Sequence, residues 1–298
     1  MARTRPGPIQ RAFRPEAREI TKVYADARAR IVSALKRGGL DPLDRRIRAS
    51  KIGEIDRIME DATKRGTRLA REKIPEAYDL GVSSVRDEVR DAHLQARARF
   101  GGIHKDQADL LTGNLVGKLE DLRLVVGRQV DDLFRNAALE VLSRTALGVG
   151  AKKISPRQAL ANEIRDRGID SFIDQARRAW DLDAYAEMVV RTTTREAITI
   201  SQAIETVGEG FDLVEILGTS VWPNSPCIPF EGTELSITGA VEGYVTVEEA
   251  MSEGLFHPNC IHDMVPIIAP RSRIESGDVS DSDAREIARI LARGNRRR

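Results

Sequence analysis

Both cysteines of this chain and two of its four histidines lie within one stretch of 36 residues. Thiolate and imidazole groups hold Zn²⁺ in tetrahedral protein sites, at distances of about 2.0 to 2.3 Å. The segment His257-Pro-Asn-Cys260-Ile-His262 offers three such groups from one turn, and Cys227 offers a fourth from another loop. These four residues are the candidate ligands of one structural zinc ion.

Other interpretations of the same residues stay open. Cys227 continues as Cys-Ile-Pro-Phe and lacks the second cysteine of a zinc knuckle, so two reduced cysteines could pack as small apolar side chains. A catalytic metal or thiol would need a general base, and Glu231 and Asp263 could serve only if the fold carried them to the cluster. No residue set predicts a catalytic site, and we expect a protein that is not an enzyme.

A run of three threonines, within Arg191-Thr-Thr-Thr-Arg-Glu196, lies in a segment that we expect to be helical. Threonine is β-branched and lowers helix propensity, so the run indicates a packing or recognition task. Hydroxyl groups buried against a neighbouring loop are the favoured explanation.

Both ends of the chain are basic. Residues 1–18 carry a net charge of +4, and residues 285–298 carry +5. Cationic arms bind phosphate backbones without reading sequence, although solubilising termini explain the same charges. The candidate DNA contacts are Arg3, Arg5, Arg11, Arg14, Arg296, Arg297 and Arg298.

Apolar periodicity predicts a helical region over residues 16–168. A first helix ends before Gly38-Gly39, a second begins near Ser50, and a third segment runs from about Pro75 to Phe100, with Pro75 near a helix start or a kink. The longest pattern, from about 105 to 147, predicts a spine helix near 40 residues, or roughly 60 Å. Ser155-Pro156 marks the start of a short helix over 155–167.

The density of Gly and Pro more than doubles after residue 207. Residues 169–180 could form a hairpin or a helical turn, and a helix capped by Asp181 follows. Alternation over 211–217 predicts a strand, and an amphipathic stretch covers 284–291. The predicted organisation is mainly α. The predicted segments are a basic flexible arm (1–15), an elongated helical region (16–168), a small α+β, turn-rich domain (169–270), and a polar tail ending in a basic stretch (271–298).

Composition narrows the classes of function. The chain has 298 residues, of which 41% are hydrophobic, 31% charged and 4% aromatic, which indicates a globular protein with a helical core. Two cysteines are too few for a disulfide framework, and charges interrupt every apolar run before the length of a membrane span. A net charge of +1 supplies no global field toward nucleic acid, so such binding would be local.

Several segments together resemble one phage protein family, the phage minor capsid protein 2 family of the MuF-like head-morphogenesis group. The similarity is carried by the order and spacing of these motifs: Ile74-Pro-Glu-Ala-Tyr78, Gly127-Arg-Gln-Val-Asp-Asp-Leu-Phe-Arg135, Tyr185-Ala-Glu-Met-Val-Val-Arg-Thr-Thr-Thr-Arg-Glu-Ala197, Asp212-Leu-Val-Glu215, Cys227-Ile-Pro-Phe-Glu-Gly232, Leu235-Ser-Ile-Thr-Gly239 and Gly254-Leu-Phe-His-Pro-Asn-Cys-Ile-His262. Two positions depart from the family pattern, at Arg178-Ala179 and at Ile261.

The resemblance implies a structural virion component, present in a few copies inside the head near the portal vertex. It implies contacts with the portal protein, the major capsid protein or packaged DNA. The short apolar runs predict no membrane partner, and the two cysteines predict a reducing compartment, which for assembly would be the bacterial host cytoplasm. Two alternatives remain: a metal-dependent hydrolase or toxin-like effector carried in the virion, and a non-specific DNA-binding protein.

Overall fold

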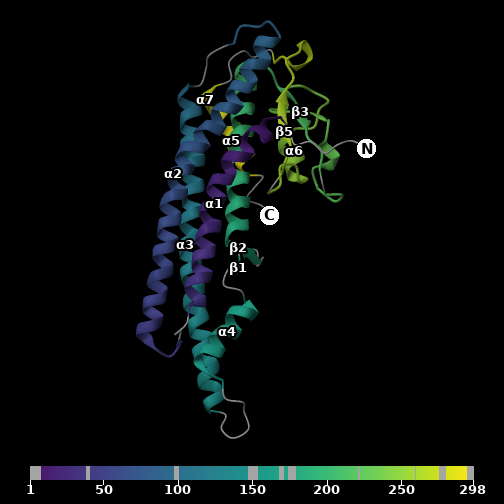
Figure 1. Cartoon of the computed structure of the whole chain (residues 1–298). Helices are drawn as coiled ribbons and strands as arrows, with labels where there is room; N and C mark the ends of the chain where they lie inside the picture. Colours follow the sequence, from purple (N-terminus) through teal and green to yellow (C-terminus); the bar gives the residue numbers. More distant parts are fainter. Residues whose placement is uncertain are drawn as a thin grey trace. The chain divides into compact units, whose positions relative to one another are not determined.

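The computed structural model describes residues 8–37, 41–96, 101–146, 154–167, 171–173, 179–220, 222–258, 260–274 and 280–293 (Figure 1). Within these residues the chain forms seven α-helices, a two-stranded hairpin and a three-stranded antiparallel sheet near the C-terminal end. The prediction of a mainly α fold with a small α+β region is confirmed.

The chain packs as two compact units that alternate along the sequence. One, which we call the bundle unit, comprises residues 18–69 and 116–187, and the other, the sheet unit, comprises 1–17, 70–115 and 188–298. Packing therefore groups segments that are distant in the sequence. The predicted consecutive domains, 16–168 and 169–270, remain a prediction.

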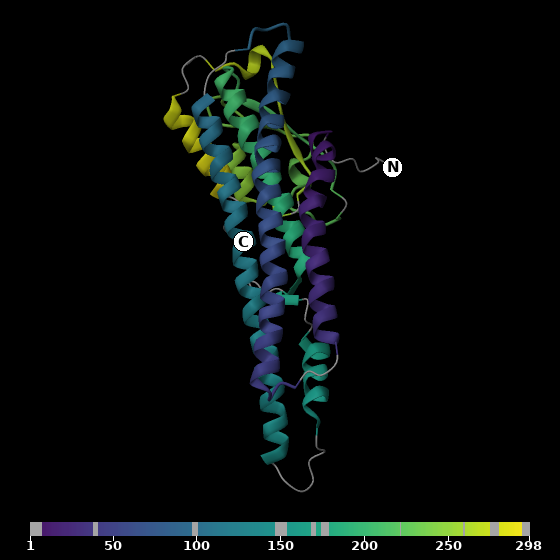
Figure 2. The ribbon, with the colours of Figure 1, turned by 60° about the vertical axis from the view of Figure 1, so that its left-hand side comes forward.

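Three long helices supply most of the bundle unit: α1 (Pro8–Lys36), α2 (Arg45–Asp91) and α3 (Gly101–Ala146). Their segments within this unit run side by side (Figure 2). Tyr24 of α1 is fully buried, and its hydroxyl would lie 3.0 Å from a Cβ placed on Gly66 of α2. Arg123 of α3 forms a two-pronged ion pair with Asp56 of α2, both bonds at 3.0 Å.

Helix α4 (Pro156–Arg167) and a short hairpin complete this unit. The Ser155 hydroxyl accepts a hydrogen bond from the Gln158 N–H at 3.1 Å, which satisfies a free donor at the helix start and confirms the predicted short helix. Strand β1 (Ser171–Ile173) pairs antiparallel with β2 (Ala179–Asp181). The ambiguous segment 169–180 therefore contains a hairpin.

Helix α2 rules out one of the two alternatives at Pro75, a new helix start. One helix of 47 residues runs through the proline. A proline removes one helical hydrogen bond and opposes this continuity. The flanking side chains Ile74, Ala77 and Tyr78 are almost completely buried, and their packing offsets the local cost.

Helix α3 confirms the predicted spine, since its 46 residues start four positions before the expected range and end one position short of it. Gly113, Gly117 and Gly127 do not interrupt it. Its apolar stripe, which includes Leu115, Leu119 and Leu122, is almost fully buried.

The sheet unit builds on helix α5 (Leu182–Gly208), whose residues from Met188 onward belong to this unit. Strand β3 (Leu213–Leu217) is central and pairs antiparallel with β4 (Glu234–Ser236) and β5 (Asp263–Pro266). Two further helices, α6 (Val247–Ser252) and α7 (Asp281–Arg293), also belong to it. The predicted strand over 211–217 and the predicted amphipathic helix over 284–291 are both present.

The predicted basic arms are only partly described. Helix α1 begins at Pro8, so the second half of the segment predicted as a flexible arm is helical. Arg11 and Arg14 lie on this helix, but their side chains are not described. Arg3, Arg5, Arg296, Arg297 and Arg298 lie outside the described residues.

Candidate metal centre

Three of the four predicted ligands converge in the sheet unit. One ligand atom from each of Cys227, His257 and Cys260 lies within 4.8 Å of the others. The two sulfur atoms are 3.6 Å apart, far beyond the roughly 2.05 Å of a disulfide. Two thiolates on a tetrahedral zinc ion, each about 2.3 Å from it, would lie about 3.8 Å apart. The group can therefore hold a metal ion with little movement of the two sulfurs.

Loops that follow short elements bring these residues together. Cys227 immediately precedes a 3-10 turn, Ile228–Phe230, and its thiol lies 3.8 Å from the Gly254 carbonyl oxygen. The other two residues lie between α6 and β5, where the Cys260 N–H donates to the His257 carbonyl at 3.0 Å. This tight turn presents both side chains on the same loop. Phe256, just before it, is buried with φ of 58°.

Hydrogen bonds fix the orientation of the His257 ring. Its Nδ1 lies 2.7 Å from the Pro258 carbonyl oxygen, and a carbonyl can only accept, so Nδ1 carries the hydrogen. The lone pair of the neutral ring is then on Nε2, which lies 3.2 Å from the Ser225 hydroxyl. A backbone carbonyl that holds the second nitrogen of a histidine is the usual support of a metal ligand.

His262 is close to this group but is not part of the converging set. Its Nδ1 lies 3.2 Å from the Cys260 sulfur, and its Nε2 lies 3.0 Å from a carboxylate oxygen of Glu231. The same oxygen accepts the Ser220 N–H at 2.6 Å. Both ring nitrogens are therefore engaged, and the structure places the predicted fourth ligand as a hydrogen-bonding partner of Cys260.

The two thiols have opposite pKa shifts. Burial opposes ionisation of Cys260, but hydrogen bonds with Cys227 and His262 and the charge of Arg195 outweigh it and bring the pKa of Cys260 well below its ordinary value. The hydrogen bond to Cys260, together with burial, raises the pKa of Cys227. Burial lowers the pKa of His262, but the neighbouring thiolate and Glu231 reverse this effect and raise it. Of the two thiols, Cys260 is thus the one that ionises more readily.

Arg195 is a contributor that the sequence analysis did not identify. It is 2% exposed, and its guanidinium carbon lies 4.9 Å from the centre of the Phe256 ring. A buried cation near Cys260 favours the thiolate form. The signal in the sequence was the unusual run from Arg191 to Glu196, in which the three threonines are confirmed as buried.

Asp212 is a second buried charge that the sequence analysis missed. Its carboxylate accepts hydrogen bonds from the Thr238 N–H at 2.8 Å, the Thr238 hydroxyl at 2.7 Å and the Ser236 hydroxyl. It therefore ties the turn after β4 to the start of β3. This is a structural role, and it lies outside the Cys-His-Cys group.

The side chains of the Cys260–His262 pair are shielded from solvent. Cys260 is 5% exposed and His262 is 1% exposed, whereas a catalytic nucleophile must reach the substrate. Of the two proposed general bases, Glu231 does lie beside the Cys260–His262 pair, and Asp263 is buried at the start of β5.

Comparison with known proteins gives one match. The sequence model for phage minor capsid protein 2 matches residues 19–296, nearly the whole chain. This match identifies the chain, with its helical fold and small turn-rich sheet region, as a structural protein of a phage particle. The chain is a member of the phage minor capsid protein 2 family, and this confirms the resemblance that its motifs indicated. No curated protein and no solved structure matches the chain.

The family assigns the protein to the virion. In the described part of the chain, no helix is both long enough and apolar enough to cross a membrane.

Proposed function

We propose that the protein acts without catalysis inside the phage head near the portal vertex, where it contacts the portal and major capsid proteins. The observation that carries this proposal is the family match over residues 19–296. Helices of 29, 47 and 46 residues support it, because they offer long lateral surfaces for protein contacts. The expected role is to assist head assembly, DNA packaging or genome delivery.

Cross-linking within intact particles tests this location. Particles of the encoding phage would be treated with a short amine-reactive cross-linker and analysed by mass spectrometry. We expect links from lysines such as Lys51 and Lys64 to portal and inner capsid residues, at a few copies per particle. Links only to tail or outer capsid proteins would overturn the location. Particles that assemble and infect normally without the chain would overturn the assembly role.

We further propose that the Cys-His-Cys group binds one structural zinc ion. Thiolate and imidazole ligands favour zinc over magnesium or calcium, and the 3.6 Å separation of the sulfurs supports this choice. Binding would require both thiols to lose their protons, and the lowered pKa of Cys260 makes this easier there than at Cys227, whose pKa is raised. Such an ion would link the loop before the 3-10 turn to the loop before β5.

Metal analysis of the purified chain tests the zinc proposal. We expect about one zinc per chain, lost in His257→Gln and Cys260→Ser and retained in His93→Gln. His93 is an exposed histidine of the same unit and serves as the matched control. A chelator should lower the melting temperature of the wild type and leave that of Cys260→Ser unchanged. Absence of metal, with melting indifferent to chelator, would overturn the proposal.

One observation favours an enzyme as the second candidate function. Cys260, His262 and Glu231 form a continuous chain of hydrogen bonds, and such chains activate thiol nucleophiles in hydrolases. A thiol-dependent hydrolase or effector requires Cys260 to be accessible. Alkylation by iodoacetamide within minutes in the native protein would support this candidate, and we expect alkylation only after metal removal.

A further inference from the structure

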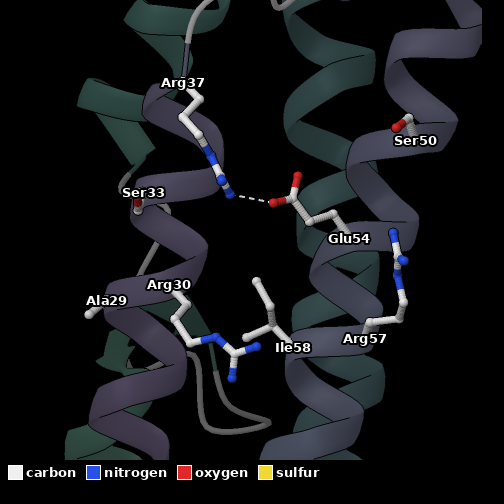
Figure 3. A pocket seen from close by; sticks show the side chains of 8 residues that line it. All are labelled: Ala29, Arg30, Ser33, Arg37, Ser50, Glu54, Arg57 and Ile58. Atoms are coloured by element: carbon white, nitrogen blue, oxygen red, sulfur yellow. Dashed lines mark hydrogen bonds and ion pairs between the residues drawn. The ribbon is translucent and has the colours of Figure 1, made fainter.

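A cleft of about 750 Å³ lies between α1 and α2, within residues 29–58 of the bundle unit (Figure 3). Its walls are polar and carry three arginines, Arg30, Arg37 and Arg57, against one carboxylate, Glu54. The side chains of Arg30 and Arg37 extend from α1 toward α2. The walls of the cleft therefore carry a net positive charge.

Helical spacing explains why these residues share the cleft. Arg30, Ser33 and Arg37 are three and four residues apart, so they occupy one side of α1, and Ser50, Glu54 and Arg57 repeat this arrangement on α2. Serines at Ser33 and Ser50 are small and leave room between the longer side chains. Seven residues of helix span about 10 Å, which equals the rise of about three nucleotides along the axis of a DNA duplex.

The guanidinium groups are only partly neutralised. Arg30 pairs with Asp61 at 3.1 Å, and Arg37 pairs with Glu54, which Lys51 also contacts at 2.9 Å. Arg57 donates its Nε–H to the Gly53 carbonyl at 3.0 Å, and no carboxylate of the described residues forms an ion pair with it. The side chains of Arg30 and Arg37 are about half exposed, so their remaining N–H groups are available.

The surrounding sequence strengthens the field at the cleft. Residues 18–69 contain 14 Lys and Arg against 8 Asp and Glu, a net charge of +6, whereas the whole chain has only +1. The near-neutral total therefore conceals a basic segment. Clustered arginines provide planar donor pairs that match phosphate oxygens.

We propose that the cleft between α1 and α2 binds the phosphodiester backbone of nucleic acid without reading base sequence. Guanidinium groups from two helices contact successive phosphates, and Glu54 competes with the phosphates for Arg37. The proposal concerns a surface separate from the basic termini and from the metal group. It does not depend on docking near the portal.

The test measures binding of the full chain to fluorescein-labelled 20-base-pair duplexes of two unrelated sequences, by anisotropy over a range of KCl concentrations. The variant Arg37→Gln/Arg57→Gln removes two cleft charges. We expect about tenfold weaker binding at 100 mM KCl and a salt slope smaller by about 1.8, since each phosphate contact contributes about 0.9. Both duplexes should respond equally.

A matched control removes two arginines of the same unit outside the cleft. The control variant is Arg128→Gln/Arg135→Gln. In the wild type, Arg128 donates its Nε–H to a carbonyl one turn earlier, as Arg57 does, and Arg135 pairs with a carboxylate, Asp131, as Arg37 does. This control should change affinity less than twofold. Glu54→Gln removes the competing carboxylate and should tighten binding about threefold, a gain that misfolding cannot produce.

Four outcomes would overturn the proposal. The first is no DNA binding by the wild type, and the second is an equal loss of affinity in the matched control. The third is a loss of affinity only when the terminal arginines are replaced by glutamine, that is, Arg3, Arg5, Arg296, Arg297 and Arg298. The fourth is equally tight binding of a poly-glutamate of similar length. The third would assign DNA binding to the basic termini, and the fourth would assign the cleft to an acidic protein partner.

Discussion

Gly218 follows strand β3 and has φ of 134°, a conformation that favours glycine. A Cβ at this position would lie 2.9 Å from Cδ2 of His262 and 3.2 Å from its Cα. Leu217 pairs with Asp263 in the sheet, so the glycine lies directly beside the histidine. The close contact explains how the sheet holds His262 against Cys260.

Alanine at Gly218 should therefore damage the site through His262. Gly232 provides the control, because it also has positive φ, of 72°, but open space around an added Cβ. We expect Gly232→Ala to cost about 1 kcal/mol from backbone strain alone, and Gly218→Ala to cost about 1 to 3 kcal/mol more, from overpacking and from a φ further from the left-handed region that alanine can adopt. Urea unfolding of both variants checks this difference. Equal losses in the free energy of unfolding would show that His262 moves aside at no cost.

The candidate site was partly predictable at the scale of single residues. Cysteine and histidine are rare in this chain, so their clustering alone indicated Cys227, His257 and Cys260. The role of His262 was not predictable, because it depends on Glu231, which is 31 residues away and meets the histidine only once β4 and β5 both pair with β3. Arg195 reaches the site from a distant helix, and no spacing rule relates it to the cysteines.

Helices α2 and α5 approach each other closely within the sheet unit. A Cβ on Gly81 would lie 1.9 Å from the Ser201 hydroxyl oxygen and 2.7 Å from the Ile198 carbonyl oxygen. The second contact involves backbone, which cannot move aside as a side chain can. The absence of a side chain at Gly81 thus sets the distance between these helices.

Replacing Gly81 with alanine should separate the two helices. We expect a loss of about 3 kcal/mol or more in the free energy of unfolding, because the added methyl group meets helix backbone. Gly113→Ala on α3 is the matched control, since a Cβ there meets nothing within 4 Å. Its higher helix propensity should stabilise the protein by up to about 1 kcal/mol. Stability is measured by thermal or urea unfolding, and a change in the same direction for both variants would contradict this account.

At the scale of elements, apolar periodicity was the sequence signal that located helices most reliably. It located α3 and α4 closely because their apolar stripes and the Ser155 cap are local signals. It left open a helix start or a kink at Pro75, and the helix continues through this residue. The buried neighbours Ile74 and Tyr78 show that tertiary packing decided the outcome.

Charge is unevenly distributed over the whole molecule. The segment 18–69 carries +6, and the remainder of the chain therefore carries −5. A total of +1 led us to expect only local binding at the termini, whereas the structure gathers arginines between α1 and α2. Total charge alone could not reveal this surface, because its charges come from two helices joined by a loop.

The Cys-His-Cys group belongs to one of the two compact units, so removal of the zinc ion proposed to bind there should have a local effect. Residues 222–258 contain a 3-10 turn, the three residues of β4 and the six residues of α6, and are otherwise loops, so a bound ion would supply much of the stability of this segment. The bundle unit has a separate core of long helices, for example Tyr24, Leu119 and Leu122.

Hydrogen exchange with and without a chelator measures this separation. After metal removal we expect amides over 222–258 to exchange at least about tenfold faster, because local opening no longer has to release the ion. Amides over 48–66 in the bundle unit should keep their rates. Cys260→Ser should reproduce the chelated pattern without chelator, and His93→Gln should match the wild type. Equal acceleration over 48–66 would instead show that the ion stabilises both units together, and unchanged rates over 222–258 would show that these loops hold without it.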